Sequence, residues 1–361
     1  MAISGSIVGR EVAAFFTQGA EWGTEATAAA EGSGIFIVED GLSLSQSLDY
    51  LEENASAFQR GADLGTISAA LNLRQNLRYD DLRGMALALG DGAYATPTEV
   101  NAGKGDYEHV IYPAEDNEGD FACVALKKGE LVQVAPSVKF AGFTLEAQPS
   151  PQRVSVSFET RANAVRNDST AITASQFEGL TAPGGAGGRA FFRQVRVYIN
   201  DQSAATLATG DEVFVSGLTF SFRRTLTEDY TNSSGLEAAE PVEDGYPEAT
   251  CVLQQPSFGA EQDGYLGDWL SKTAKKLKIE FKGSAATEAT GTVADDTLRI
   301  EAPHALVESM EPGPYGGPGR IPATVSFRLL GAESTSDAPG MTFVQPFRLT
   351  AINSQGAKAV S

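Results

Sequence analysis

Cysteine, histidine and basic residues are all scarce in this chain of 361 residues. The two cysteines, Cys123 and Cys251, fall in separate predicted strands and lack metal-binding spacing, so we expect small buried hydrophobic residues rather than a disulfide or a zinc site. The two histidines, His109 and His304, are too few for a histidine-rich metal centre and fit no catalytic triad pattern. The sequence therefore predicts no metal, no cofactor and no catalytic residues, and we expect that the protein is not an enzyme.

The shortage of basic residues also bears on partners. The chain has 27 Lys and Arg against 47 Asp and Glu, which gives a formal net charge of −20 at pH 7. Proteins that bind nucleic acid tightly need clustered Lys and Arg, so the net charge argues against tight nucleic-acid binding but not against DNA lying nearby. Between Glu11 and Gln59 there are nine acidic residues and no basic one. This region would repel polyanions, although a simple solvated acidic surface is the alternative interpretation.

Long hydrophobic runs are missing as well. The apolar run VAAFF at residues 12–16 is too short for a signal peptide, and nothing in the chain resembles a membrane span. We therefore expect a protein that is soluble in the cytoplasm before any assembly.

Glycine and alternating strands are what the chain has in abundance. There are 38 glycines, which indicates many turns and a strand-rich architecture. Leu42, Leu44 and Leu48 share one face of a predicted strand and alternate with polar residues. The run from Ile67 to Leu77 repeats this pattern. Two long strands that are wet on one face predict an antiparallel sheet with a solvated side.

Two amphipathic helices are predicted, each following an alternating strand. The first covers residues 79–89, with Gly90 as its C-terminal stop, and the second covers about 264–274. The second helix is expected to lay one stripe against a sheet, made of Leu266, Trp269, Leu270 and Thr273.

The order of predicted elements in residues 35–165 recurs in residues 191–335. In each, an alternating strand precedes a polar loop, a second strand, a helix, a short strand and a late strand. This order predicts two tandem copies of one β-rich module. The expected boundaries are an N-terminal arm at 1–30, a first module at 31–165, a Gly-rich linker at 166–190, a second module at 191–350 and a C-terminal tail at 351–361.

Three segments of the first module carry a resemblance to a known family. They are GAEWGTEATAA at residues 19–29, GSGIFIVEDGLSLSQSLDYLEE at 32–53 and YDDLRGMALALG at 79–90. Together they resemble the start of the tail tube proteins (major tail proteins) of long-tailed bacteriophages, in which a segment like the one from Glu21 to Glu25 precedes a strand, a loop and a helix that ends in Leu-Gly. The second module is similar to this family only through the internal repeat.

The resemblance implies a mainly β (α+β) fold of two tandem tail-tube-like β-sandwich or split-barrel modules, each with one flanking helix. It implies a structural virion protein that forms stacked rings of the phage tail tube and conducts DNA into the host cell. The protein would be made in the host cytoplasm and used in the virion tail. The implied partners are further copies of the chain, the tape-measure, tail terminator and baseplate proteins, and DNA that passes through the lumen without specific binding. No membrane partner is implied.

The resemblance also assigns residues to surfaces. The polar sides of the long strands would face the lumen, with Ser43, Ser45, Ser47, Ser68, Asn72, Asn76, Thr219, Ser221 and Arg223 as candidates. Related rings contain six single modules, so a tandem chain would form a homotrimer that is a pseudo-hexamer. Contacts between rings would come from the arm, the tail and the long polar loops 49–64 and 227–248, with Trp22, Glu52, Glu53, Phe58, Glu240 and Glu243 as candidates.

Two other classes of function remain open on the sequence. One is a carbohydrate-binding or adhesin-like β-sandwich of a tail tip or baseplate, which would present Trp or Tyr on a concave face. Trp22 and Trp269 instead fall in the arm and on a helix. The other is a β-rich hydrolase that uses two of the many carboxylates, which an assay for glycan cleavage would reveal.

Overall fold

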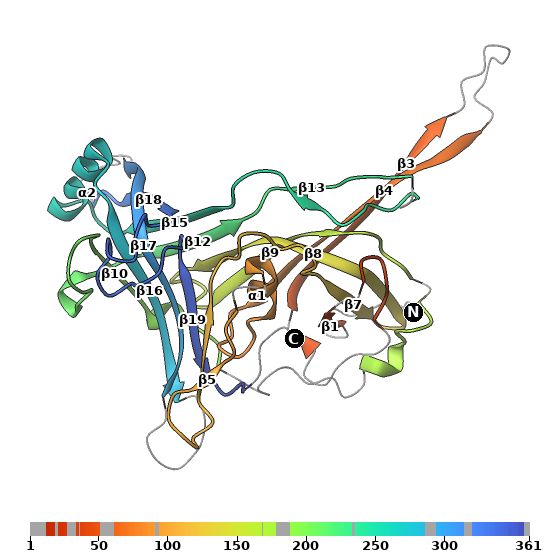
Figure 1. The fold of residues 1–361 in the computed structure, drawn as a ribbon, viewed down its shortest axis with the longest axis horizontal. Helices are drawn as coiled ribbons and strands as arrows, with labels where there is room; N and C mark the ends of the chain where they lie inside the picture. Colours follow the sequence, from red (N-terminus) through yellow and green to blue (C-terminus); the bar gives the residue numbers. More distant parts are fainter. Residues whose placement is uncertain are drawn as a thin grey trace, which may run out of the picture.

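A computed structural model shows a mainly β protein (Figure 1). Within its described residues, seventeen strands join into one sheet and every pairing between them is antiparallel. The mainly β fold expected from the sequence is therefore confirmed. The structure describes residues 12–18, 21–26, 34–35, 37–50, 61–90, 94–167, 169–177, 188–232, 235–285, 294–313 and 320–356.

In the N-terminal half of the chain, up to residue 162, the described residues form ten strands and helices. They are β1 (Val12–Gln18), β2 (Gly34–Ile35), β3 (Ile37–Tyr50), β4 (Ala62–Asn76), α1 (Arg83–Leu89), β5 (Thr98–Glu99), β6 (Tyr107–Ile111), β7 (Ala122–Lys128), β8 (Leu131–Ala147) and β9 (Val154–Ala162). The principal strands pair in the order β1-β7-β8-β9-β4-β3.

In the C-terminal half, from residue 195, the part of the chain that the structure describes forms eleven strands and helices. They are β10 (Val195–Asp201), β11 (Glu212–Val213), β12 (Gly217–Arg223), β13 (Leu226–Thr227), β14 (Val242–Glu243), β15 (Glu248–Gln255), α2 (Ala260–Ser271), β16 (Lys275–Ala285), β17 (Asp295–Pro312), β18 (Ala323–Leu330) and β19 (Arg348–Asn353). Its principal strands pair in the order β10-β16-β17-β18-β15-β12. The pairing order of the first half thus recurs strand for strand, and in both halves the helix follows the strand that pairs with the late strand.

Two strand pairs join the halves. β12 pairs with the C-terminal part of β8, and β19 pairs with β6. Phe143 of β8, Phe220 and Phe222 of β12 and Phe347 pack their rings together behind the first pair, with centroids 5.1–6.1 Å apart. Most of the buried hydrophobic residues of both halves belong to one large cluster. The core is therefore shared across the junction, and aromatic packing at its centre stabilises it.

The long hairpin of β3 and β4 projects away from the body of the protein (Figure 1). Near the body the predicted alternation holds, because Leu71, Leu73 and Leu77 are buried. The prediction that Leu44 and Leu48 lie on a dry face is wrong for the single chain, since both are about half exposed. They extend past the core, and no described segment of the chain covers them.

The helices differ from their predicted limits and faces. α1 begins at Arg83 rather than 79, because the backbone of Tyr79 is held by other segments: its N–H donates to Gly188 O at 3.4 Å and its carbonyl accepts from Asn353 Nδ2 at 2.7 Å. Gly90 does end the helix, with a φ of 92° that favours glycine.

The stripe predicted for α2 is wrong. Tyr265 faces the core, and its ring meets that of Phe327 edge-on at 5.7 Å. Leu266, Trp269 and Leu270 are 36%, 43% and 74% exposed. Periodicity showed an apolar stripe, but a different side chain of the helix contacts the sheet.

The segments predicted as arm and linker also have structure. Residues 12–18 of the arm form β1, an integral strand beside β7 and β2. In the linker range, Arg166 forms an isolated β-bridge with Val134, and Ala174–Phe177 forms a short 3-10 helix. A second 3-10 helix, Phe192–Gln194, lies just after the end of the predicted linker. A third such turn, Thr209–Asp211, precedes β11. Residues 1–11 and 178–187 lie outside the described residues.

Candidate assembly surface

One face of the sheet is polar and runs across both halves. A single row of directly paired residues crosses it, one from each of six neighbouring strands: Arg74, Ser157, Thr144, Ser221, Thr250 and Arg328. Residues two positions along a strand point to the same side, so this row fixes which side chains share the face. We call it the polar face. Its opposite side carries the aromatic core.

The predicted channel-lining residues fall on this face. Ser68, Asn72 and Asn76 share the alternation of Arg74 in β4, and Thr219 and Arg223 share that of Ser221 in β12. Ser43 and Ser45 of β3 pair with Ala70 and Ser68, and Ser47 follows in the same alternation on the projecting hairpin. Part of the set lines a groove of ≈ 390 Å³ that spans β4, β9, β8 and β12. The register thus brings the residues from separate strands into one surface.

Four arginines of the polar face lie close to carboxylates. Arg223 forms an ion pair with Glu159 at 3.2 Å, and Arg328 one with Glu248 at 2.7 Å. Arg161 lies 3.6 Å from Glu228, and Arg74 lies 3.7 Å from Glu39. Such exposed pairs add little stability, but they leave these arginines with small net fields toward a polyanion.

A buried arginine marks the junction of the two halves. Arg224 follows β12, and its guanidinium, which is fully buried, donates to Ala88 O, Leu89 O and Ala114 O at 2.8–3.1 Å. The first two carbonyls lie at the C-terminal end of α1, where unpaired carbonyls and the helix dipole favour a cation. Glu243 forms the ion pair that compensates its charge.

The long acidic loop after β12 lies across the N-terminal half. We call residues 225–232 and 235–248 the strap; its path over β8 and β9 toward β4 is visible in Figure 1. Leu236 O accepts from Ile67 N at 2.8 Å, and Ala238 O accepts from Trp22 Nε1 at 3.0 Å. Glu237 pairs with Arg166 at 3.3 Å. The strap is therefore held by several contacts along its length.

Glu240 anchors the strap to a buried lysine. Lys139, which is 2% exposed, donates to Glu240 Oε1 at 2.6 Å, and Gly119 N donates to the same oxygen at 2.8 Å. Of the predicted ring-contact residues, Trp22, Glu240 and Glu243 are thus engaged within the chain. Glu52, Glu53 and Phe58 lie outside the described residues. Sequence reasoning missed Lys139 and Arg224, although a charge inside an apolar strand, as in SVKFAGF, is the signal that could have identified them.

The β3–β4 hairpin has an open edge and exposed apolar side chains that no described segment covers. In the described residues β3 pairs only with β4, so its other edge is open. Its exposed apolar side chains are Val38, Leu44, Leu48, Tyr50 and Leu64, each 49–60% exposed. An open edge beside an apolar patch is a site for association.

His109 and both cysteines are buried. His109 is buried, with its Nδ1 2.5 Å from Tyr94 Oη and its Nε2 2.9 Å from Asn353 Oδ1; burial lowers its pKa. Cys123 and Cys251 are buried and free, as expected, and burial raises the pKa of Cys123 to about 11. Among the described residues no group of three or more His, Cys, Asp or Glu could hold a metal, and neither helix is long and apolar enough to cross a membrane.

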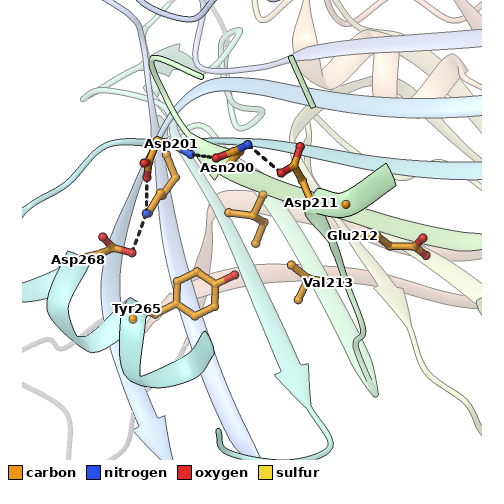
Figure 2. Close-up of a pocket in the computed structure, with 11 residues that line it drawn as sticks. Asn200, Asp201, Asp211, Glu212, Val213, Tyr265 and Asp268 are labelled. Atoms are coloured by element: carbon orange, nitrogen blue, oxygen red, sulfur yellow. Dashed lines mark hydrogen bonds and ion pairs between the residues drawn. The ribbon is translucent and has the colours of Figure 1, made fainter. Parts of the chain in front are cut away.

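An acidic pocket of ≈ 360 Å³ lies between β10, β11 and α2 (Figure 2). Its carboxylates already have partners: Lys275 contacts Asp201 at 2.6 Å and Asp268 at 2.9 Å, and Asn200 donates to Asp211 at 2.8 Å. Glu212 pairs with Arg196 at 3.2 Å. The carboxylates that line the pocket are therefore paired with neighbouring side chains in a charge network within the chain.

Asp80 and Asp296 form a buried acidic pair, and the charges of Arg78 and Arg83 offset only part of the effect of burial on Asp80. Asp80 is 6% exposed, and neither of its carboxylate oxygens has a hydrogen-bond partner. Burial raises its pKa to about 6, and burial together with the charge of Asp80 raises the pKa of Asp296 to about 7. The two residues come from opposite halves, so their repulsion acts at a second place where the halves meet.

Comparison with models of known protein families gives no match, and comparison with curated proteins gives none either.

Proposed function

We propose that the chain is a structural subunit of a phage tail tube, built from two tail-tube-like modules, which forms stacked rings that conduct DNA into the host cell. The observation that carries the proposal is the recurrence of one strand order in both halves, joined edge to edge so that one polar face continues across them. In this proposal the polar face lines the lumen. The protein acts in the virion tail after synthesis in the host cytoplasm.

The charges fit a conduit. The polar face offers hydroxyls and amides, and four of its arginines, Arg74, Arg161, Arg223 and Arg328, are paired with carboxylates. DNA binding needs uncompensated Lys and Arg, so such a lumen lets DNA pass without retention. The other partners in this proposal are the tape-measure, tail terminator and baseplate proteins.

Two modules per chain set the expected stoichiometry. Three chains supply six modules, so we propose a homotrimeric ring with pseudo-sixfold symmetry. The N-terminal segment, the C-terminal tail and the tip of the β3–β4 hairpin would contact the next ring.

Negative-stain electron microscopy of the purified protein over a range of concentrations tests this function. Tubes or stacked rings with a central channel, and a mass of three chains per ring, are the expected result. A protein that stays monomeric at all concentrations, and also when mixed with assembled tail tips as initiators, would overturn it.

A further inference from the structure

The junction inside the chain has a vacant counterpart, and the β-bulges of the two long strands locate it. In β8, Ala135-Pro136 is followed by an extra residue, Ala141, in the register with β9. In β17, Ala302-Pro303 is followed at the same distance by an extra residue, Glu308, in the register with β18. This alignment makes Gly142 correspond to Ser309.

A second observation supports the same alignment. The pairing of β7 on β8 reaches Val138, and the pairing of β16 on β17 reaches Ala305. These two residues correspond under the bulge alignment. The two long strands are therefore covered on the same edge by equivalent strands that stop at equivalent positions.

Beyond this point the halves differ. In β8, residues 142–147 are paired with β12 on the edge that β7 has left. In β17, the corresponding edge from residue 309 to 312 has no partner among the described residues, since β18 takes the other edge. The chain thus contains one filled and one empty copy of the same site.

The strand that corresponds to β12 is β3. The bulge alignment equates β9, the partner of β8, with β18, the partner of β17. It then equates their next neighbours, β4 and β15, so that Ala70 corresponds to Thr250. Ala70 pairs with Ser43 and Thr250 pairs with Ser221, so Ser43 corresponds to Ser221. Leu44 corresponds to Phe222. Phe222 is 1% exposed, whereas Leu44 is 51% exposed. The chain therefore carries the filling strand as well, with its apolar face uncovered.

We infer that the open edge of β3 in one copy pairs with the open edge of β17 in the next, in the manner of β12 on β8. The register transferred from the internal junction places Ser45 opposite Ser309 and Leu44 opposite Met310, which is 7% exposed. The two edges are different surfaces, so the contact is head-to-tail and propagates around a ring. The occupant is a second copy of this chain.

The exposed end of α2 belongs to the same contact. In the chain, Arg224 covers the C-terminal end of α1, all of whose residues are buried. The residue that corresponds to Arg224 is Gln46, on the projecting hairpin. The hairpin of one copy then extends over Trp269 and Leu270 of the next, which are exposed in the single chain.

Paired cysteines test the contact in the full chain. The double variant Ser45→Cys/Ser309→Cys should give, on oxidation, a ladder of covalent oligomers in non-reducing gels. Each single variant should run as a monomer on the same gels, because in this contact its added cysteine faces no second cysteine and cannot form a disulfide between copies. Ser45→Cys/Ser336→Cys, with the second cysteine in an exposed loop, is the matched control. A dimer from Ser45→Cys alone would mean that β3 edges pair with one another, and it would overturn the inference, as would a double variant that cross-links no more than the control.

A charge variant gives the converse test. Leu44→Asp should keep the melting temperature of the monomer but weaken self-association at least tenfold in analytical ultracentrifugation, while Val100→Asp, at another exposed apolar residue, leaves it unchanged. Equal association of both variants would refute the contact. The inference rests on the proposed function but can be tested separately from it. A cross-linked ladder without tubes would refute the tube and support the contact between β3 and β17. Tubes without a ladder would support the tube and refute this contact.

Discussion

β12 and β3 present nearly the same pattern of residues in opposite surroundings. The runs LSLSQSLD, residues 42–49, and FSFRRTLT, residues 220–227, both alternate apolar and polar side chains. Phe222 is buried against a ring cluster, while Leu44 faces solvent. The comparison shows that alternation decides which side of a strand is apolar, whereas burial depends on what the rest of the assembly places against it.

The largest expected effect separates these two strands by truncation. Phe222→Ala should lower the free energy of unfolding by about 3–5 kcal/mol, because it empties a packed site at the junction. Leu44→Ala should change it by no more than about 0.5 kcal/mol in the monomer. Urea unfolding at a concentration too low for assembly measures both. Equal losses for the two variants would mean that the hairpin is buried in the free chain.

The second prediction contrasts buried charges at two places where the halves meet. At one, Arg224 pairs with Glu243. At the other, the charge of Asp80 raises the pKa of Asp296. The pKa values of Asp80 and Asp296 are raised to about 6 and about 7, above the value of roughly 4 in an unfolded chain. The folded state therefore holds protons more tightly. The contribution of this pair to stability is full below about pH 4 and is lost as the pH rises through 6 and 7.

Asp296→Asn should reduce that fall by about 2–4 kcal/mol between pH 5 and pH 8, at roughly 1.4 kcal/mol per pKa unit. Urea unfolding at the two pH values is the measurement. Asp229→Asn is the matched control, since Asp229 is exposed and is not among the charges that act on Asp296. If both variants show the slope of the parent protein, the buried acidic pair does not titrate in this range.

The third prediction concerns the strap. It joins β12 to β15, as the hairpin tip joins β3 to β4, but the strap already packs against the N-terminal half of the same chain. Glu240→Gln should cost about 1–3 kcal/mol, because it leaves the buried ammonium of Lys139 without its carboxylate. Lys139→Met/Glu240→Gln should recover much of this loss. Glu248→Gln, which breaks an exposed pair with Arg328, should change stability by less than about 1 kcal/mol. A neutral Glu240→Gln would mean that the strap does not stabilise the free chain.

Sequence reasoning recovered what is encoded locally. The mainly β class, the dry side of β4 at Leu71 and Leu73 and the glycine stop at Gly90 all follow from periodicity and backbone sterics. It failed where remote segments decide. The start of α1 is set by contacts of Tyr79 with Gly188 and Asn353, and the contacts of Trp22 and Glu240 are set by the strap. Nothing within a few residues of these positions carries that information.

The smallest effect on stability tests the polar face itself. Ser45→Lys should change the free energy of unfolding by no more than about 0.5 kcal/mol, because Ser45 is exposed and its hydroxyl lies 3.5 Å from Ser68 O. Urea unfolding checks this part. If the polar face lines a channel, each ring gains one uncompensated cation per chain. Assembled protein should then retain duplex DNA, and the affinity should fall as salt rises.

The control for this charge is Ala102→Lys, at an exposed position in the turn between β5 and β6, two strands that do not contribute to the polar face. Both variants carry the same added charge, so net charge alone predicts equal DNA retention. A lumen predicts a difference, because cations arranged around an enclosed passage act on the DNA together, and particles that carry Ser45→Lys should eject DNA slowly. Equal DNA retention by the two variants, or DNA ejection at the parent rate, would mean that the polar face does not line the channel. The open sheet edges would then be the remaining candidate assembly surfaces of the protein.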